Sequence, residues 1–337
     1  MSICKAVVLS WVAGTAALGG SVLFAPSARP SVSSAEVSAA PRPGDRDAFF
    51  ERLMVGGAAN GKIYVEVPLK AAAFANATSA ESRRAVWDAF FGRVLREKPP
   101  EFGGSGPVPY WGEFAYRKVD WTSVAGAVDI KVGDVLRVRT SSTDALVKVL
   151  RYAVHHEWHG NSNLLLAVAQ PLSGFKVASA DFLVAARRLP PCGSGCMPRA
   201  RTPDAETLER IRKVVSIGAK IPAGQQIKEI RALEGHFTRA TRQYVVYVDF
   251  GAGPDTSLVG YWRTVVLDAD LSLIAVIGEN EYSHIEPRFV SDVDGDALDE
   301  VWVGLSGYEG RNAGLMYWRG GVGNGSFRII QNAYYGL

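Results

Sequence analysis

The sequence predicts an α+β fold in two parts: an N-terminal antiparallel sheet with a packed helix, then an all-β region built from two copies of one unit. Two observations predict this. Runs of alternating apolar and polar residues, typical of half-buried strands, fill much of the chain. A Tyr-Trp-Arg tripeptide also occurs twice in the last hundred residues. The composition, 47% hydrophobic and 21% charged, excludes a wholly disordered or fibrous protein.

Breaks in these patterns divide the chain of 337 residues into four segments. They are a signal peptide or N-terminal anchor with a tether (1–40), an α+β domain of unknown type (45–190), a connector with a helix (191–230) and a β-repeat domain (231–337). The net charge of +3, without a long Lys/Arg run, argues against nucleic acid or an anionic membrane as the main partner.

The N-terminus predicts export. Lys5 precedes Ala6–Ala25, 20 residues without a charge, and small residues follow that a signal peptidase accepts, with Ala35 and Ala39 as candidate cleavage sites. An uncleaved anchor is the alternative, because 20 helical residues reach across a bilayer core of about 30 Å. We expect a periplasmic or secreted location, with membrane contact only through this segment if it stays uncleaved.

The sequence pattern of the N-terminal domain predicts two helices before its main strands. Phe49, Phe50, Leu53 and Met54 have helical spacing, and 62–69 alternates like a strand. A capping box formed by Thr78 and Glu81 precedes a helix over 83–98.

Later patterns predict a hairpin, a further strand and the connector helix. The hairpin joins 146–158 to 164–169, and 181–189 adds a strand. In the connector, we expect Thr202 to cap a helix that stops at Gly218.

The C-terminal region predicts an internal repeat. Tyr261-Trp262-Arg263 recurs 56 residues later as Tyr317-Trp318-Arg319, and apolar positions keep the same offset. Two copies, roughly 235–290 and 291–337, would each form short strands like a propeller blade. Because a solenoid or propeller needs at least three copies, we expect no closed propeller.

The main candidate site is an acidic loop, DVDGDALDE, with five carboxylates in nine residues. Ca²⁺ takes six to eight oxygens, and a tight loop can aim side chains 1, 3 and 5 at one point. The predicted calcium residues are Asp292, Asp294, Asp296, Leu298 through its carbonyl, Asp299 and Glu300. An EF-hand is disfavoured, because its twelfth position would be Val303. The alternative is a solvated acidic turn, in which the like charges would repel one another.

The stretch DVDGDALDEVWVG resembles the calcium loop of FG-GAP repeats, found in the integrin α-subunit propeller and in bacterial VCBS-type repeats. The resemblance covers about a third of the chain. It implies that Asp292, Asp294, Asp296, the Leu298 carbonyl and the acid at position 9 ligate calcium. Ala297 stands where that pattern has Gly, which is penalised if the position needs a positive φ, and Glu300 replaces the usual Asp.

A histidine-rich stretch is a weaker candidate. Alternation on a strand puts His155, Glu157 and His159 on one face, near the range in which three side chains bind Zn²⁺. A polar hairpin end is the simpler explanation, so zinc is not the expected cofactor. The zinc interpretation would make the protein a cell-envelope metal-dependent hydrolase.

The two cysteines after the signal, Cys192 and Cys196, predict a small-loop disulfide in an oxidising compartment, and a reduced pair or half of a metal site is the alternative. Together these features favour an exported, non-catalytic binding or scaffolding protein with structural calcium. Its expected partner is a protein or glycan ligand at the cell envelope.

Overall fold

The computed structural model describes residues 43–99, 115–157, 162–173, 180–192, 196–218, 227–251, 262–280, 283–307, 310–320 and 325–331. All of the described residues belong to one compact unit, within Ala40–Leu337. The predicted export segment therefore lies outside the described residues. The helices are α1 (Pro43–Phe50), the 3₁₀ helix η1 (Ala71–Phe74), α2 (Ala80–Val94), α3 (Trp121–Ala127) and α4 (Ala205–Gly218).

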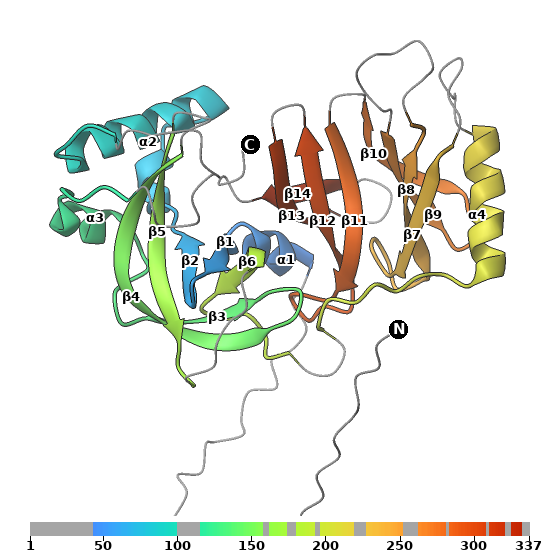
Figure 1. The fold of residues 1–337 in the computed structure, drawn as a ribbon, viewed down its shortest axis with the longest axis horizontal. Coiled ribbons are helices and arrows are strands. Elements are labelled where there is room, and N and C mark those ends of the chain that lie inside the picture. The colour runs from blue at the N-terminus through green and yellow to red at the C-terminus, as the bar shows by residue number, and fades with distance from the viewer. Residues whose placement is uncertain are drawn as a thin grey trace, which may run out of the picture. The chain divides into compact units, whose positions relative to one another are not determined.

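The protein is mostly β, with three antiparallel sheets (Figure 1). The first contains β1 (Met54–Ala59), β2 (Lys62–Glu66), β3 (Val135–Arg139), β4 (Asp144–Glu157), β5 (Ser162–Pro171) and β6 (Ala180–Ala186). The second contains β7 (Glu229–Gly235), β8 (Gln243–Asp249), β9 (Trp262–Asp268) and β10 (Leu273–Asn280). The third contains β11 (Ser283–Ser291), β12 (Glu300–Gly307), β13 (Gly310–Arg319) and β14 (Ser326–Gln331).

The N-terminal sheet closes on itself as a small barrel. Its strands pair in the order β1-β2-β5-β4-β3-β6, and β6 also pairs with β1. Alternate side chains point inward, as the two-residue period of a strand requires, and fill the interior with apolar groups such as Ile63, Val65, Leu136 and Val138. An antiparallel sheet was expected here, and the predicted β4–β5 hairpin is present, with its turn outside the described residues.

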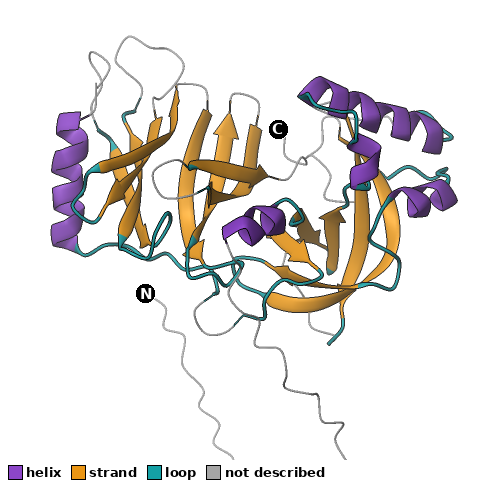
Figure 2. Ribbon diagram, turned by 180° about the vertical axis from the view of Figure 1, so that it is seen from behind, coloured by secondary structure: helices purple, strands orange, loops and turns teal. Residues whose placement is uncertain are grey.

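The helices follow the predicted pattern with shifted ends. α2 packs Phe90, Phe91 and Val94 against the barrel, but Ser79 caps it by accepting the Ser82 N–H at 3.1 Å, so the Thr78 cap was wrong. Figure 2 shows α2 and α3 beside the barrel strands.

Two further helix ends differ from the prediction. α4 starts at Ala205, after Asp204 accepts the Thr207 N–H at 2.7 Å, so Asp204 replaces Thr202 as the cap. α1 ends at Phe50, because Met54 is already paired with Ala185 in the barrel.

The two C-terminal sheets have the same design. In each, four strands pair in chain order, β7 to β10 and β11 to β14. Their facing surfaces share one core, to which β8 contributes Val245 and β12 contributes Val301 and Val303. α4 covers the other face of the β7–β10 sheet with Ile211 and Val215.

The tripeptides that predicted the repeat do not occupy equivalent places. Trp262 begins β9, whereas Trp318 lies at the end of β13. Val245 and Val301 are also 56 residues apart and lie on the second strand of their sheets. Val245 pairs with Val266 on β9, whereas Val301 pairs with Met316 on β13. The hairpins differ in length: residues 250–261 separate β8 from β9, but only 308 and 309 separate β12 from β13. The offset of 56 is therefore wrong for the third strand.

The third sheet also packs on the barrel and on α1. Its Trp302 and Tyr317 share a core with Phe182 and Val184 of β6 and with Phe50 of α1. The Phe50 and Tyr317 rings stack with their centroids 4.1 Å apart. α1 is thus held against the sheet that carries the acidic loop.

Candidate functional site

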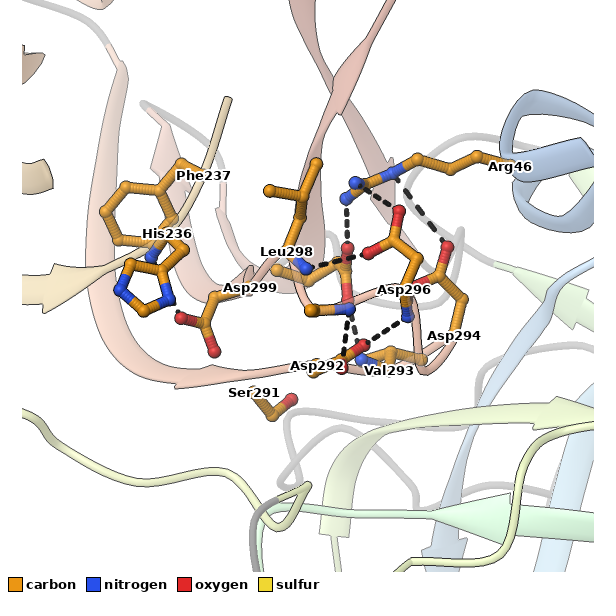
Figure 3. A network of polar contacts seen from close by, with 12 residues as sticks. Arg46, His236, Phe237, Ser291, Asp292, Val293, Asp294, Asp296, Leu298 and Asp299 are labelled. Atoms are coloured by element: carbon orange, nitrogen blue, oxygen red, sulfur yellow. Dashed lines mark hydrogen bonds and ion pairs between the residues drawn. The ribbon is translucent and has the colours of Figure 1, made fainter. Parts of the chain in front are cut away.

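The acidic loop connects β11 to β12. Ser291 and Glu300, at its two ends, face each other across the sheet, so the loop closes a hairpin. Asp292 shapes it: Oδ1 accepts the N–H groups of Gly295 at 2.7 Å and Asp296 at 3.1 Å, and Oδ2 accepts the Ala297 N–H at 3.0 Å (Figure 3). Such side-chain bonds to nearby amides hold a turn in place of a backbone ladder.

Two residues of the loop have left-handed backbone conformations. Gly295 has φ 82° and Ala297 has φ 69°. Position 297 therefore meets the condition under which a non-glycine residue is penalised, because the Cβ of an L-residue crowds the following carbonyl in this region.

The loop and the first residue of β12 bring carboxylates together. Asp292, Asp294 and Glu300 each offer an oxygen within 4.8 Å of the others, the only such group of three metal-ligating side chains among the described residues. Asp294 and Glu300 are buried, at 3% and 0% exposure. Asp296 directs one oxygen, Oδ1, toward the loop backbone, where it accepts the Leu298 N–H at 2.8 Å.

An arginine that sequence patterns did not reveal lies against this cluster. Arg46, on α1, is 5% exposed. Its Nη1 donates to Asp296 Oδ2 at 2.7 Å, its Nη2 donates to Glu300 Oε1, and its Nε lies 3.9 Å from Asp294 Oδ2 (Figure 3). No local signal could have found it, since about 250 residues separate it from its partners.

Burial makes the negative charges costly. It raises the pKa of Asp294 to about 8, with a further upward effect from Asp296 that Arg46 only partly offsets. Burial raises the pKa of Glu300 well above its usual range, and Asp294 adds to this effect. Burial also raises the pKa of Asp292, although the hydrogen bonds from the loop amides lower it in part. One guanidinium does not neutralise four carboxylates, so the cluster favours a further positive charge.

Asp299, predicted among the calcium residues, points elsewhere. Its Oδ2 accepts Arg201 Nη1 and the His236 N–H, both at 2.9 Å, and its own N–H donates to the His236 carbonyl at 2.6 Å. The carboxylate thus joins the loop to the end of β7. Leu298 is half-buried in the loop, and its N–H holds Asp296.

A second arginine ties the loop to the barrel. Arg139, at the end of β3, is fully buried; its Nη1 donates to the Val293 carbonyl at 3.3 Å and its Nη2 to the Pro190 carbonyl at 2.7 Å. A cavity of about 380 Å³ lies beside it and is bordered by Asp292, Gly295, Ala297 and Asp299 among others. Cys196, which forms a disulfide with Cys192 as predicted, also borders the cavity.

His155 and His156 of the histidine-rich stretch lie near the end of β4. His155 is 2% exposed, and burial, with a smaller effect of His156, lowers its pKa to about 4. His156 Nδ1 lies 3.0 Å from Asn163 Oδ1 on β5. The Glu157 side chain and His159 lie outside the described residues. The structure therefore describes only one of the three predicted zinc ligands at side-chain level.

Comparisons with protein-family models, with curated proteins and with solved structures find no match to this chain. The resemblance to FG-GAP repeats therefore depends on the residues of the loop alone.

Replacing Ala297 with glycine should stabilise the protein. The left-handed conformation costs about 1–2 kcal/mol for an L-residue, and the extra freedom of glycine in the unfolded chain offsets part of the gain. We expect a net increase of about 0.5–1 kcal/mol in the free energy of unfolding, measured by urea denaturation. Ala200→Gly, at an exposed loop residue without a positive φ, should give no gain. Equal effects of the two substitutions would contradict this account.

The pH dependence of stability should report the raised pKa of Asp294. Between pH 4 and 8 the folded chain holds this proton longer than the unfolded chain, whose aspartate has a pKa near 3.8. In EDTA, stability should therefore fall as pH rises through this window, by at most about 1.4 kcal/mol per unit for one group.

Asp294→Asn is the reference for this measurement. Buried His155 has the opposite dependence between its folded pKa of about 4 and its usual 6.5. Because the substitution leaves His155 unchanged, the difference between the two proteins reports Asp294 together with its effect on the neighbouring Glu300. Parallel curves of unfolding free energy against pH would show that Asp294 ionises normally.

Proposed function

We propose that the Asp292–Glu300 loop binds Ca²⁺ and that the ion holds the C-terminal sheets in shape. The observation that carries this is Asp294 Oδ2, which is buried and has no hydrogen-bond donor among the described residues. It belongs to the three-carboxylate group with Asp292 and Glu300. Ca²⁺ binds several hard oxygen ligands at once. The FG-GAP resemblance implies two further ligands beside these three carboxylates, the Asp296 carboxylate and the Leu298 carbonyl.

The role of the ion is structural in this proposal. The carboxylates lie between two strands of one hairpin, and several of their oxygens hold loop amides. The two four-stranded sheets would be propeller-blade-like units that do not close a ring. In support, α4 covers the outer face of one sheet, and the barrel and α1 cover that of the other, where further blades would pack.

The protein as a whole would be an exported, non-catalytic binding or scaffolding protein at the cell envelope. A protein or glycan is the proposed ligand. The uncharged run Ala6–Ala25 and the disulfide Cys192–Cys196 support export, since disulfides persist in oxidising compartments. No helix among the described residues is long and apolar enough to cross a membrane.

The hydrolase alternative has less support. It needs His155, Glu157 and His159 to hold a metal open to substrate, and His155 is almost completely buried. Elemental analysis separates the two ideas, because calcium alone favours the structural role, whereas stoichiometric zinc lost on His159→Ala favours the enzyme.

Export predicts where the chain is found and how it starts. In source cells, fractionation followed by N-terminal sequencing should find the protein outside the cytoplasm. A new N-terminus after Ala35 or Ala39 indicates cleavage, and an intact membrane-bound form indicates an anchor. Intact protein confined to the cytosol would make the export proposal wrong.

Calcium should raise the melting temperature. An ion that binds only the folded loop stabilises it by about 2.7 kcal/mol at a free concentration of 100 times Kd, which corresponds to several degrees. Asp294→Asn should reduce this gain, because it removes a charged oxygen. In EDTA at a pH above 8, where Asp294 is ionised, the variant should melt slightly higher than the wild type, because repulsion is relieved.

The measurement is a melting series in EDTA and in millimolar Ca²⁺. The control, Asp88→Asn, changes an exposed aspartate on α2 and should respond to calcium like the wild type. Identical wild-type melting in the two buffers, with no calcium by elemental analysis, would reduce the loop to an acidic turn.

A further inference from the structure

Apart from Asp299, which pairs with Arg201, the carboxylates of the loop have oxygens of two kinds. One set holds backbone amides: both oxygens of Asp292, Asp294 Oδ1, Asp296 Oδ1, and Glu300 Oε2, which accepts the Val293 N–H at 2.6 Å. The other set faces the Arg46 guanidinium and comprises Asp294 Oδ2, Asp296 Oδ2 and Glu300 Oε1. The second set contains the oxygens that no loop amide uses and that are therefore freest to bind a cation.

The guanidinium fits this second set imperfectly. Arg46 Nε and Asp294 Oδ2 are both buried without a hydrogen-bond partner among the described residues, although they lie only 3.9 Å apart. A buried ion pair with unsatisfied atoms leaves part of the desolvation cost of both charges uncompensated. A cation that takes its ligands from Asp294 and Glu300, which also belong to the metal-ligating group, would compete with the guanidinium for these carboxylates.

We propose that Arg46 is a built-in competitor of the cation and thereby sets the calcium affinity of the loop. This inference builds on the proposed calcium function. Asp294 and Glu300 belong both to the metal-ligating group and to the Arg46 ion pairs. Calcium must displace the guanidinium from these carboxylates. The two positive charges of the ion then replace the single positive charge of the arginine.

The helix that carries Arg46 stays in place during this exchange. α1 is held by the stacking of Phe50 on Tyr317 and by Arg319, which lies 3.3 Å from both Asp47 and Glu51. The tethered guanidinium therefore stays near the loop. If it is docked in about nine molecules in ten, the apparent affinity for calcium is about tenfold weaker than that of the open loop.

The test compares calcium dissociation constants by isothermal titration calorimetry. Arg46→Gln removes the competing charge and should bind calcium roughly tenfold more tightly than the wild type. The matched control, Arg201→Gln, removes an arginine that pairs with Asp299 and has no ion pair with the three oxygens that face Arg46. It should change the dissociation constant by no more than about threefold, because the Arg201 side chain is partly exposed, so its charge is screened, and the Arg46 contacts remain in place.

The outcomes separate the two proposals. Unchanged or weaker binding by Arg46→Gln, with measurable wild-type binding, overturns the competition and leaves the calcium proposal standing. An equal gain in both variants also overturns it, since that would be a general charge effect. If neither the wild type nor Arg46→Gln binds calcium, both proposals fail.

A measurement on the wild type keeps the proposal testable if Arg46→Gln does not fold. The side-chain Nε–H resonance of Arg46, assigned by its loss in Arg46→Lys, should be protected from exchange with water in EDTA. Saturating calcium should remove this protection. Protection that persists with calcium bound would show that ion and guanidinium share the cluster, which overturns the proposal.

Discussion

The structure around the loop depends on one constraint: carboxylates taken out of water need positive charge or N–H donors close by. The acids of the Asp292–Glu300 loop obtain positive charge from distant parts of the chain and most of their N–H donors from the loop itself. α1 supplies Arg46 to three of them, and the loop's own amides bind Asp292. Arg139 of the barrel and Arg201 of the connector hold the Val293 carbonyl and the Asp299 carboxylate. The loop is thus a meeting point of segments that are far apart in sequence.

Apolar packing reinforces the same junction. The barrel face formed by Val55, Phe182 and Val184 is covered by Trp302 and Tyr317 of the third sheet. The loop follows β11 and leads directly into the strand that carries Trp302, so movement of the barrel against this sheet would disturb the acidic cluster. A cation bound there would stabilise more than its hairpin, because Arg46, Arg139 and Arg201 link the loop to α1, the barrel and the connector.

Local patterns predicted the strands well and their long-range pairing poorly. The alternation of β4 and β5 and the loop between them predicted that hairpin, which the register confirms. Nothing local indicates that β6 pairs with both β1 and β3, because closure depends on the twist and stagger of all six strands together. The repeat shows the same limit, since the Tyr-Trp-Arg match concealed a difference in hairpin length that moved Trp318 to the far end of its strand.

The sequence by itself determined the acidic loop and the pairing of Cys192 with Cys196, because each depends on residues within one short segment. It also indicated that Ala297 would be penalised at a positive φ, and the folded backbone has such a φ there. The tertiary structure decided which acids face one another. It turned Asp299 away to Arg201, buried Asp294 and Glu300, and placed Arg46 among the carboxylates. Burial and charge pairing depend on what packs around a group, and here the packing comes from a helix some 250 residues away in the chain.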